Sequence, residues 1–128
     1  MQALLVRLVA LVFLLYGAGF IVAPAPLMLK VVGEVPVASS AWIDMRATYG
    51  GLSVGVGVIL WVLAGSAVTL RTGALGVTVL MVGMALGRGV GIAVDGNPNG
   101  YMLLYLAMEA VAAILGVWAW ASLRAVEP

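Results

Sequence analysis

The sequence predicts an all-α integral membrane protein, a four-helix bundle in which residues 1–128 form a single domain. Of the 128 residues, 65% are hydrophobic and only 9% are charged, whereas soluble domains carry about 25% charged residues. The apolar residues fall into four runs, each near the roughly 20 residues that an α-helix needs to cross a bilayer. Proline, glycine and polar residues separate these runs. We therefore expect membrane helices at about residues 3–22, 42–68, 73–94 and 101–123.

The composition excludes several classes of site. The chain contains neither cysteine nor histidine, which removes disulfides, thiol catalysis and the usual zinc and haem ligands. We accordingly predict no metal site and no resident cofactor. The net charge of +1, without a basic run, argues against nucleic acid as a partner. The expected surroundings are the lipid bilayer.

The first apolar run, 3–22, carries a single charged residue, Arg7. It is longer than the apolar region of a typical signal peptide, which favours a retained membrane helix over a cleaved leader. Pro24, Pro26 and Pro36 then end this helix and prevent a continuous second one. Residues 23–41 are therefore predicted as an outer loop, with room for a short apolar element on the membrane surface.

Glycines at helical spacing mark the second and third runs. A spacing of four residues between small side chains lets two helices approach closely in lipid. In the third run the glycines also flank Arg88 and would leave room for a backbone or a ligand beside its guanidinium. We expect close helix packing at Gly51, Gly55, Gly83, Gly87 and Gly91.

Charges outside the membrane predict the orientation. Short polar turns at 69–72 and 95–100 connect the last three helices. With four crossings, Arg7, Arg71 and Arg124 lie on the side of both termini, and Lys30 lies on the other side. The positive-inside rule then places both termini of this multi-pass protein in the cytoplasm.

Polar side chains inside the apolar runs are expected to share one depth. An arginine near the centre of a membrane helix costs roughly 2.5–3.5 kcal/mol on insertion scales and therefore needs a partner. Glu109 is the only acid in the fourth run, so we expect it to pair with Arg88. At about 1.5 Å of rise per residue, the other polar residues lie near the same outer level of the bundle. The candidate buried polar cluster, and the candidate ligand-binding site, is Arg88, Glu109, Arg46, Asp44, Tyr49 and Tyr16.

Short motifs are spread over the last three helices: Asp44-x-Arg46-x-x-Tyr49-Gly50-Gly51, Gly87-Arg88, Asp95-Gly96-x-Pro98 and Glu109-Ala110. Together they resemble the bacterial family catalogued as domain of unknown function 4345. The resemblance implies a small four-helix membrane protein with this arginine and glutamate as its hallmark and, with the orientation above, a place in a bacterial inner membrane. It implies no established activity. The overall plan is also similar to DoxX-like proteins, which are linked to redox and quinone chemistry, but only in architecture.

Several interpretations of the polar cluster stay open at this point. In the first, an Arg88–Glu109 pair fixes helix order and register, and Arg46, Asp44 and the tyrosines satisfy its remaining hydrogen-bonding groups. The protein is then an accessory or assembly subunit that packs its glycine-rich faces against a larger membrane complex. A homo-oligomer is the other arrangement that the sequence allows.

Two further interpretations give the cluster a chemical role. In one, it forms the floor of an outward-facing pocket for a small amphipathic ligand, a lipid or a quinone-like molecule, with Arg46 or Arg88 at its head group. In the other, the protein is an isomerase or quinone-linked enzyme, with Glu109 as general acid or base and Tyr49 as donor. A neighbouring guanidinium opposes that role because it favours the ionised carboxylate. We therefore rank the accessory subunit first and lean against an enzyme.

Overall fold

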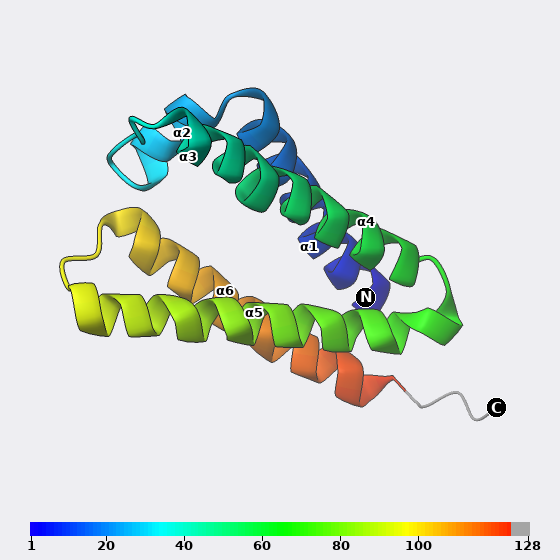
Figure 1. Ribbon diagram of the computed structural model, residues 1–128. Helices are drawn as coiled ribbons and strands as arrows, with labels where there is room; N and C mark the ends of the chain where they lie inside the picture. The colour runs from blue at the N-terminus through cyan, green and yellow to red at the C-terminus, as the bar shows by residue number, and fades with distance from the viewer. Residues whose placement is uncertain (124–128) are drawn as a thin grey trace.

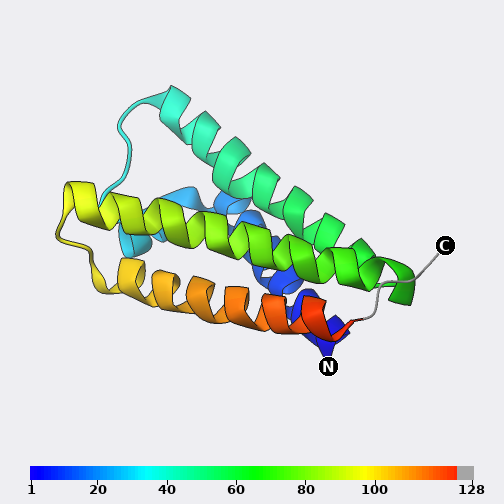
Figure 2. The same ribbon diagram turned by 90° about the horizontal axis from the view of Figure 1, so that it is seen from below.

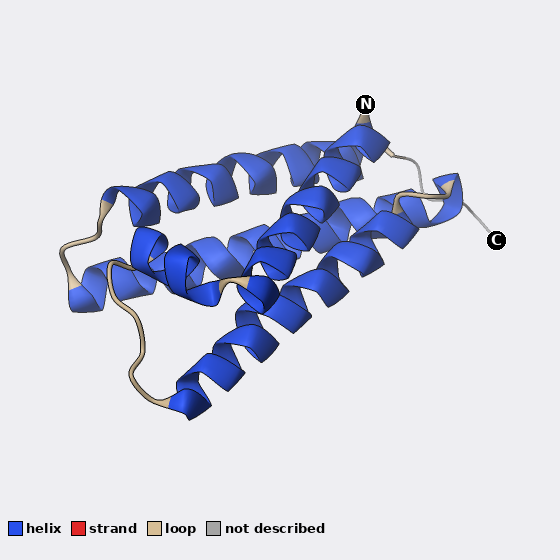
Figure 3. Ribbon diagram, turned by 90° about the horizontal axis from the view of Figure 1, so that it is seen from above, coloured by secondary structure: helices blue, strands red, loops and turns tan. Residues whose placement is uncertain are grey.

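The structure, a computed structural model, describes residues 1–123. Helices account for all the regular structure in this range, without a strand (Figures 1 and 3). The elements are α1 (Gln2–Val22), α2 (Pro24–Val31), α3 (Ser39–Met45), the π-helical turn η1 (Arg46–Gly51), α4 (Leu52–Leu63), α5 (Ala67–Asp95) and α6 (Gly100–Ser122).

Four helical segments within the described range are long and apolar enough to cross a membrane. They are α1, the continuous segment Ser39–Leu63 formed by α3, η1 and α4, then α5 and α6. The predicted fold class, an all-α membrane protein with four spans, is confirmed. The cytoplasmic position of the termini stays a prediction, and Arg124, on which it partly depends, lies outside the described residues.

The helices form two antiparallel hairpins (Figure 1). In one, α1 packs along α4 and η1, and in the other, α5 packs along α6. The hairpins meet where α1 begins and where α4 turns into α5, and they diverge towards the end that carries α2 and the connection between α5 and α6 (Figures 1 and 2). We call these the closed end and the open end.

Small and branched apolar side chains fill the closed end. Val6, Ala74 and Val77 have no exposed surface, and Leu60 keeps only 2%. Small residues let the helices approach closely, which is the main source of packing energy between helices in lipid. The buried cluster consists of Val6, Ala10, Leu60, Ala64, Ala74, Val77, Met81, Ala113 and Ala119.

The turn between the second and third spans lies earlier than predicted. The helix expected at 42–68 ends at Leu63, and α5 already begins at Ala67, so the turn expected at 69–72 is helical. Ser66 is the N-cap, because its side chain accepts a hydrogen bond from the Val68 amide at 3.2 Å. The Thr69 hydroxyl also donates to the Leu63 carbonyl at 2.8 Å. Thr69, which the prediction assigned to the turn, thus satisfies a carbonyl at the end of α4 from within α5.

The predicted outer loop, 23–41, contains more helix than expected. Pro24 occupies the first position of α2, where its missing amide hydrogen costs nothing. Gly33, at φ +96°, follows the end of this helix. The Asn99 side-chain amide donates to the Val31 carbonyl at 2.9 Å and so ties α2 to the start of α6 at the open end.

The predicted packing glycines do not lie at helix crossings within the chain. A Cβ added at Gly55, Gly83 or Gly87 would meet nothing within 4 Å, and one at Gly51 or Gly91 would meet only its own helical segment. The expectation is therefore wrong for contacts inside the chain, because spacing identifies a small-residue face but not the helix that covers it.

Other glycines make the close crossings. A Cβ at Gly17 of α1 would lie 2.6 Å from the Gly50 carbonyl oxygen, and one at Gly57 would lie 2.7 Å from Leu14 Cγ. In the second hairpin, a Cβ at Gly116 would lie 2.6 Å from Thr78 Oγ1. Each hairpin is thus held together by contacts that only a glycine permits.

Candidate functional site

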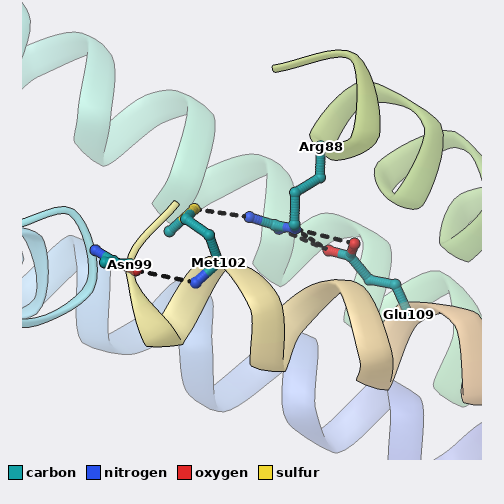
Figure 4. A network of polar contacts seen from close by, with 4 residues as sticks. All are labelled: Arg88, Asn99, Met102 and Glu109. Carbon is teal, nitrogen blue, oxygen red and sulfur yellow. Dashed lines mark hydrogen bonds and ion pairs between the residues drawn. The ribbon is translucent and has the colours of Figure 1, made fainter. Parts of the chain in front are cut away.

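Arg88 of α5 and Glu109 of α6 form an ion pair inside the second hairpin (Figure 4). Arg88 Nη2 lies 2.6 Å from Glu109 Oε1, and Arg88 Nε lies 3.0 Å from Oε2. Two parallel N–H donors on one carboxylate are the strongest arrangement of this pair. Only 18% of the Arg88 side chain and 6% of the Glu109 side chain are exposed. The predicted pairing is confirmed.

Arg88 has further contacts along α6. Its Nη1 lies 3.2 Å from the sulfur of Met102 (Figure 4), and its guanidinium carbon lies 5.3 Å from the centre of the Tyr105 ring. The ring face is attractive to a cation at this distance. The carboxylate of Glu109, the sulfur of Met102 and the ring of Tyr105 thus all contact the guanidinium, and all three belong to α6.

Aromatic rings lie at the open end on both hairpins. In the first hairpin, the centroids of Tyr16 and Phe20 are 4.7 Å apart, and those of Phe20 and Tyr49 are 5.4 Å apart. In the second hairpin, the centroids of Tyr101 and Tyr105 are 6.4 Å apart. We call these two sets of rings together the aromatic cluster, which consists of Tyr16, Phe20, Tyr49, Tyr101 and Tyr105.

Arg46 and Asp44 do not join the ion pair. Arg46 is exposed and its Nη1 donates to the Ile21 carbonyl near the end of α1. Asp44 is exposed too and accepts a hydrogen bond from the Thr48 hydroxyl at 3.3 Å. The expectation that these residues satisfy the pair is wrong, because Arg88 and Glu109 satisfy each other within their own hairpin. The predicted cluster therefore divides into an ion pair with nearby tyrosines and a separate Arg46 site.

The Arg46 site lies at a π-helical turn, η1. It begins at Arg46 and ends at Gly51, within the span that the sequence predicts as regular helix. A π turn holds one more residue than an α turn and so changes the direction of the side chains before it. A Cβ at Gly50 would lie 2.6 Å from Ile21 Cγ1, so this turn also depends on glycine to approach α1.

Four residues of the site were not predicted from the sequence: Phe20, Tyr101, Met102 and Tyr105. Phe20 follows Tyr16 by four residues and Tyr105 precedes Glu109 by four, which places each pair on one helix face. That spacing was a usable signal. Met102 carried none, because methionine in an apolar run is ordinary. Among residues 1–123, no group of three or more Asp, Glu, His or Cys side chains is arranged to hold a metal ion.

No curated protein and no solved structure matches this chain significantly. A family model does match, under the description Domain of unknown function (DUF4345), and it covers residues 1–120. The matched range includes the ion pair, the aromatic cluster, Arg46 and nearly all of the fourth span. The chain therefore belongs to the DUF4345 family, as a small multi-pass membrane protein.

Proposed function

We propose that this protein is an accessory subunit of a larger membrane complex and that it packs against an apolar helix of its partner. The contact surface is the glycine face of α5, which consists of Gly83, Gly87 and Gly91. The course of α5 past α4 is the observation on which this rests.

Near the closed end, one side of α5 packs closely on α4. A Cβ at Gly73 would lie 3.1 Å from Leu63 Cβ, and one at Gly76 would lie 3.5 Å from Leu60 Cδ2. At about 100° of rotation per residue, Gly73, Gly76 and the three residues of the glycine face all fall within an arc of about 80° around the α5 axis. The glycine face therefore lies on the same side of α5 as the residues that pack on α4. Away from the turn that joins them, α4 diverges from α5 (Figure 2), and a Cβ at Gly83 or Gly87 would meet nothing within 4 Å. The side of α5 that packs on α4 near the closed end is thus uncovered along Gly83 and Gly87.

A helix suits this face better than lipid does. Small residues four apart let another backbone approach, which gives dispersion contacts and Cα–H···O contacts that a flexible acyl chain does not match. The neighbours Met84, Leu86 and Val90 are exposed and apolar. The expected partner is therefore an apolar transmembrane helix that also presents small residues.

The geometry of the ion pair supports an internal role for it. An anionic head group at Arg88 would have to compete with Glu109, which already accepts from Nε and Nη2. An enzyme that used Glu109 as general acid or base would need its carboxylate oxygens free for a substrate, and both already accept hydrogen bonds from Arg88. In this proposal the role of the ion pair is to hold α5 and α6 together.

The aromatic cluster favours one second candidate. A planar, neutral, lipid-soluble molecule such as a quinone would find tyrosine ring faces on each hairpin at the open end, at Tyr16 and Tyr49 on one and at Tyr105 on the other. An ion pair has no net charge and is compatible with such a ligand. This candidate needs a bound molecule, whereas the first needs a bound protein.

Native mass spectrometry after gentle extraction from the source membrane separates the two. We expect a larger protein in fixed stoichiometry with the wild-type chain, its loss in Gly87→Leu, and its retention in Gly55→Leu. Gly55 is the matched control, because it is equally open but lies on α4. A wild-type chain without a protein partner, or a partner kept by Gly87→Leu, contradicts the accessory role. A small molecule on a chain without partner, released by Tyr105→Ala, would support the second candidate.

A further inference from the structure

A crevice separate from the ion pair lies at the open end, beside the last turn of α1. It has a volume of about 390 Å³ and is lined by Val22, Ala23, Pro24, Ala25, Pro26, Trp42 and Arg46. We call it the Arg46 crevice. Its wall is apolar except for one guanidinium, and this volume lies within the range of small-molecule sites.

Arg46 is held in place and keeps part of its hydrogen-bonding capacity. Its Nη1 donates to the Ile21 carbonyl, one of the carbonyls at the end of α1 that lack a partner in the helix. Arg88–Glu109 is the single ion pair in the described range, so no carboxylate there neutralises Arg46. The nearest acid in sequence, Asp44, bonds instead to the Thr48 hydroxyl. The guanidinium thus offers a positive charge and free N–H donors in an apolar crevice.

The position of the crevice identifies the chemistry that fits it. Val22 is the last residue of α1, so the crevice lies where that span leaves the hydrocarbon. Trp42 lines the same crevice, and tryptophan prefers the level of the lipid head groups. A planar guanidinium matches a phosphate group through two parallel hydrogen bonds. Apolar walls next to that charge suit the glycerol and the first methylenes of a lipid.

We propose that the Arg46 crevice binds the phosphate group of a membrane phospholipid. The lipid phosphate accepts from the free N–H groups of Arg46, and its chain lies along Pro26 and Val22. Such a lipid fills the crevice between α1, α2 and α3 and stabilises the native state by mass action. The site is independent of the glycine face and of any protein partner.

The test measures the melting temperature of the purified full-length chain in a neutral detergent, with and without dioctanoyl phosphatidylglycerol. We expect the lipid to raise the melting temperature of the wild type by a few degrees. The rise is expected to persist in Lys30→Gln, which removes an exposed cation of the same end that does not line the crevice. In Arg46→Gln the rise, measured against that variant's own baseline, is expected to disappear.

A second variant covers the case in which Arg46→Gln fails to fold. Ala25→Trp fills the crevice from α2 and leaves Arg46 in place, so it is expected to abolish the rise as well. A rise that survives in Ala25→Trp, or one equal in wild type and Arg46→Gln, overturns the site. Inorganic phosphate at the same concentration is expected to have no effect. An equal rise from inorganic phosphate overturns the lipid as the source of the phosphate group.

Discussion

Arg88 is the charged residue with the most complete set of contacts in the described chain. Its guanidinium meets Glu109, the Met102 sulfur and the Tyr105 ring, all on α6. A lone charge in the membrane interior is costly, and two charges that satisfy each other avoid most of that cost. Removal of one partner is therefore expected to destabilise the folded protein more than removal of both.

At this residue, Arg88→Ala is expected to destabilise the protein by about 3–5 kcal/mol, because it leaves the Glu109 carboxylate buried and unpaired. The double variant Arg88→Leu with Glu109→Leu should recover much of that loss. Thermal unfolding in detergent measures both, with Lys30→Ala as an exposed control. Equal melting temperatures for wild type and Arg88→Ala would falsify the buried pair as a stabilising contact.

Helix crossings depend on which glycines meet a neighbouring backbone. At Gly17 an added Cβ would lie 2.6 Å from the Gly50 carbonyl oxygen and 2.8 Å from the Val54 amide nitrogen. Backbone atoms of a regular helix cannot move aside as a flexible side chain does. The hairpin of α1 and α4 therefore has no room for a single extra carbon at this crossing.

Gly17→Ala is expected to lower stability by about 1–3 kcal/mol, the usual cost of overpacking a well-packed contact. Gly55→Ala is the matched control, because a Cβ there meets nothing within 4 Å. In this control, helix propensity alone should keep or slightly raise stability. Thermal unfolding of both variants in one detergent makes the comparison. Similar melting temperatures would show that the two hairpin helices separate easily at Gly17.

In the molecule as a whole, both connections at the open end lie opposite the start of α1, the end of α6 and the turn between α4 and α5 (Figures 1 and 2). Four spans require this arrangement, and the charge count predicts its direction in the membrane, with the termini in the cytoplasm. The chain has no cysteine, so the labelling of a single introduced cysteine shows on which side of the membrane that one position lies.

With an impermeant maleimide on intact bacterial cells, we expect Val37→Cys to be labelled. Ser66→Cys should be labelled only after the membrane is permeabilised. Val37, at the open end, and Ser66, in the opposite turn, are both exposed, so access to the reagent is the variable. The reverse pattern would place the termini outside and overturn the positive-inside assignment.

The sequence by itself determined the class of the protein, its four spans and the Arg88–Glu109 pair. Apolar runs of membrane length need no tertiary information, and two opposite charges inside adjacent runs have few other partners. The turn at 64–66 was predicted at 69–72, because Thr69 and Thr72 resemble turn residues although both lie inside α5.

Only the tertiary structure decided which faces meet. It places the close helix crossings at Gly17, Gly57 and Gly116. It pairs Arg46 with the Ile21 carbonyl and not with the ion pair, and it leaves the glycine face of α5 without a covering helix. In lipid all these helices are apolar on every side, so the sequence contrast that distinguishes buried from exposed faces in water is missing. The arrangement of the helices therefore depends on close glycine contacts in which a single added Cβ would clash. The spacing of glycines along the sequence does not predict which of them make such contacts.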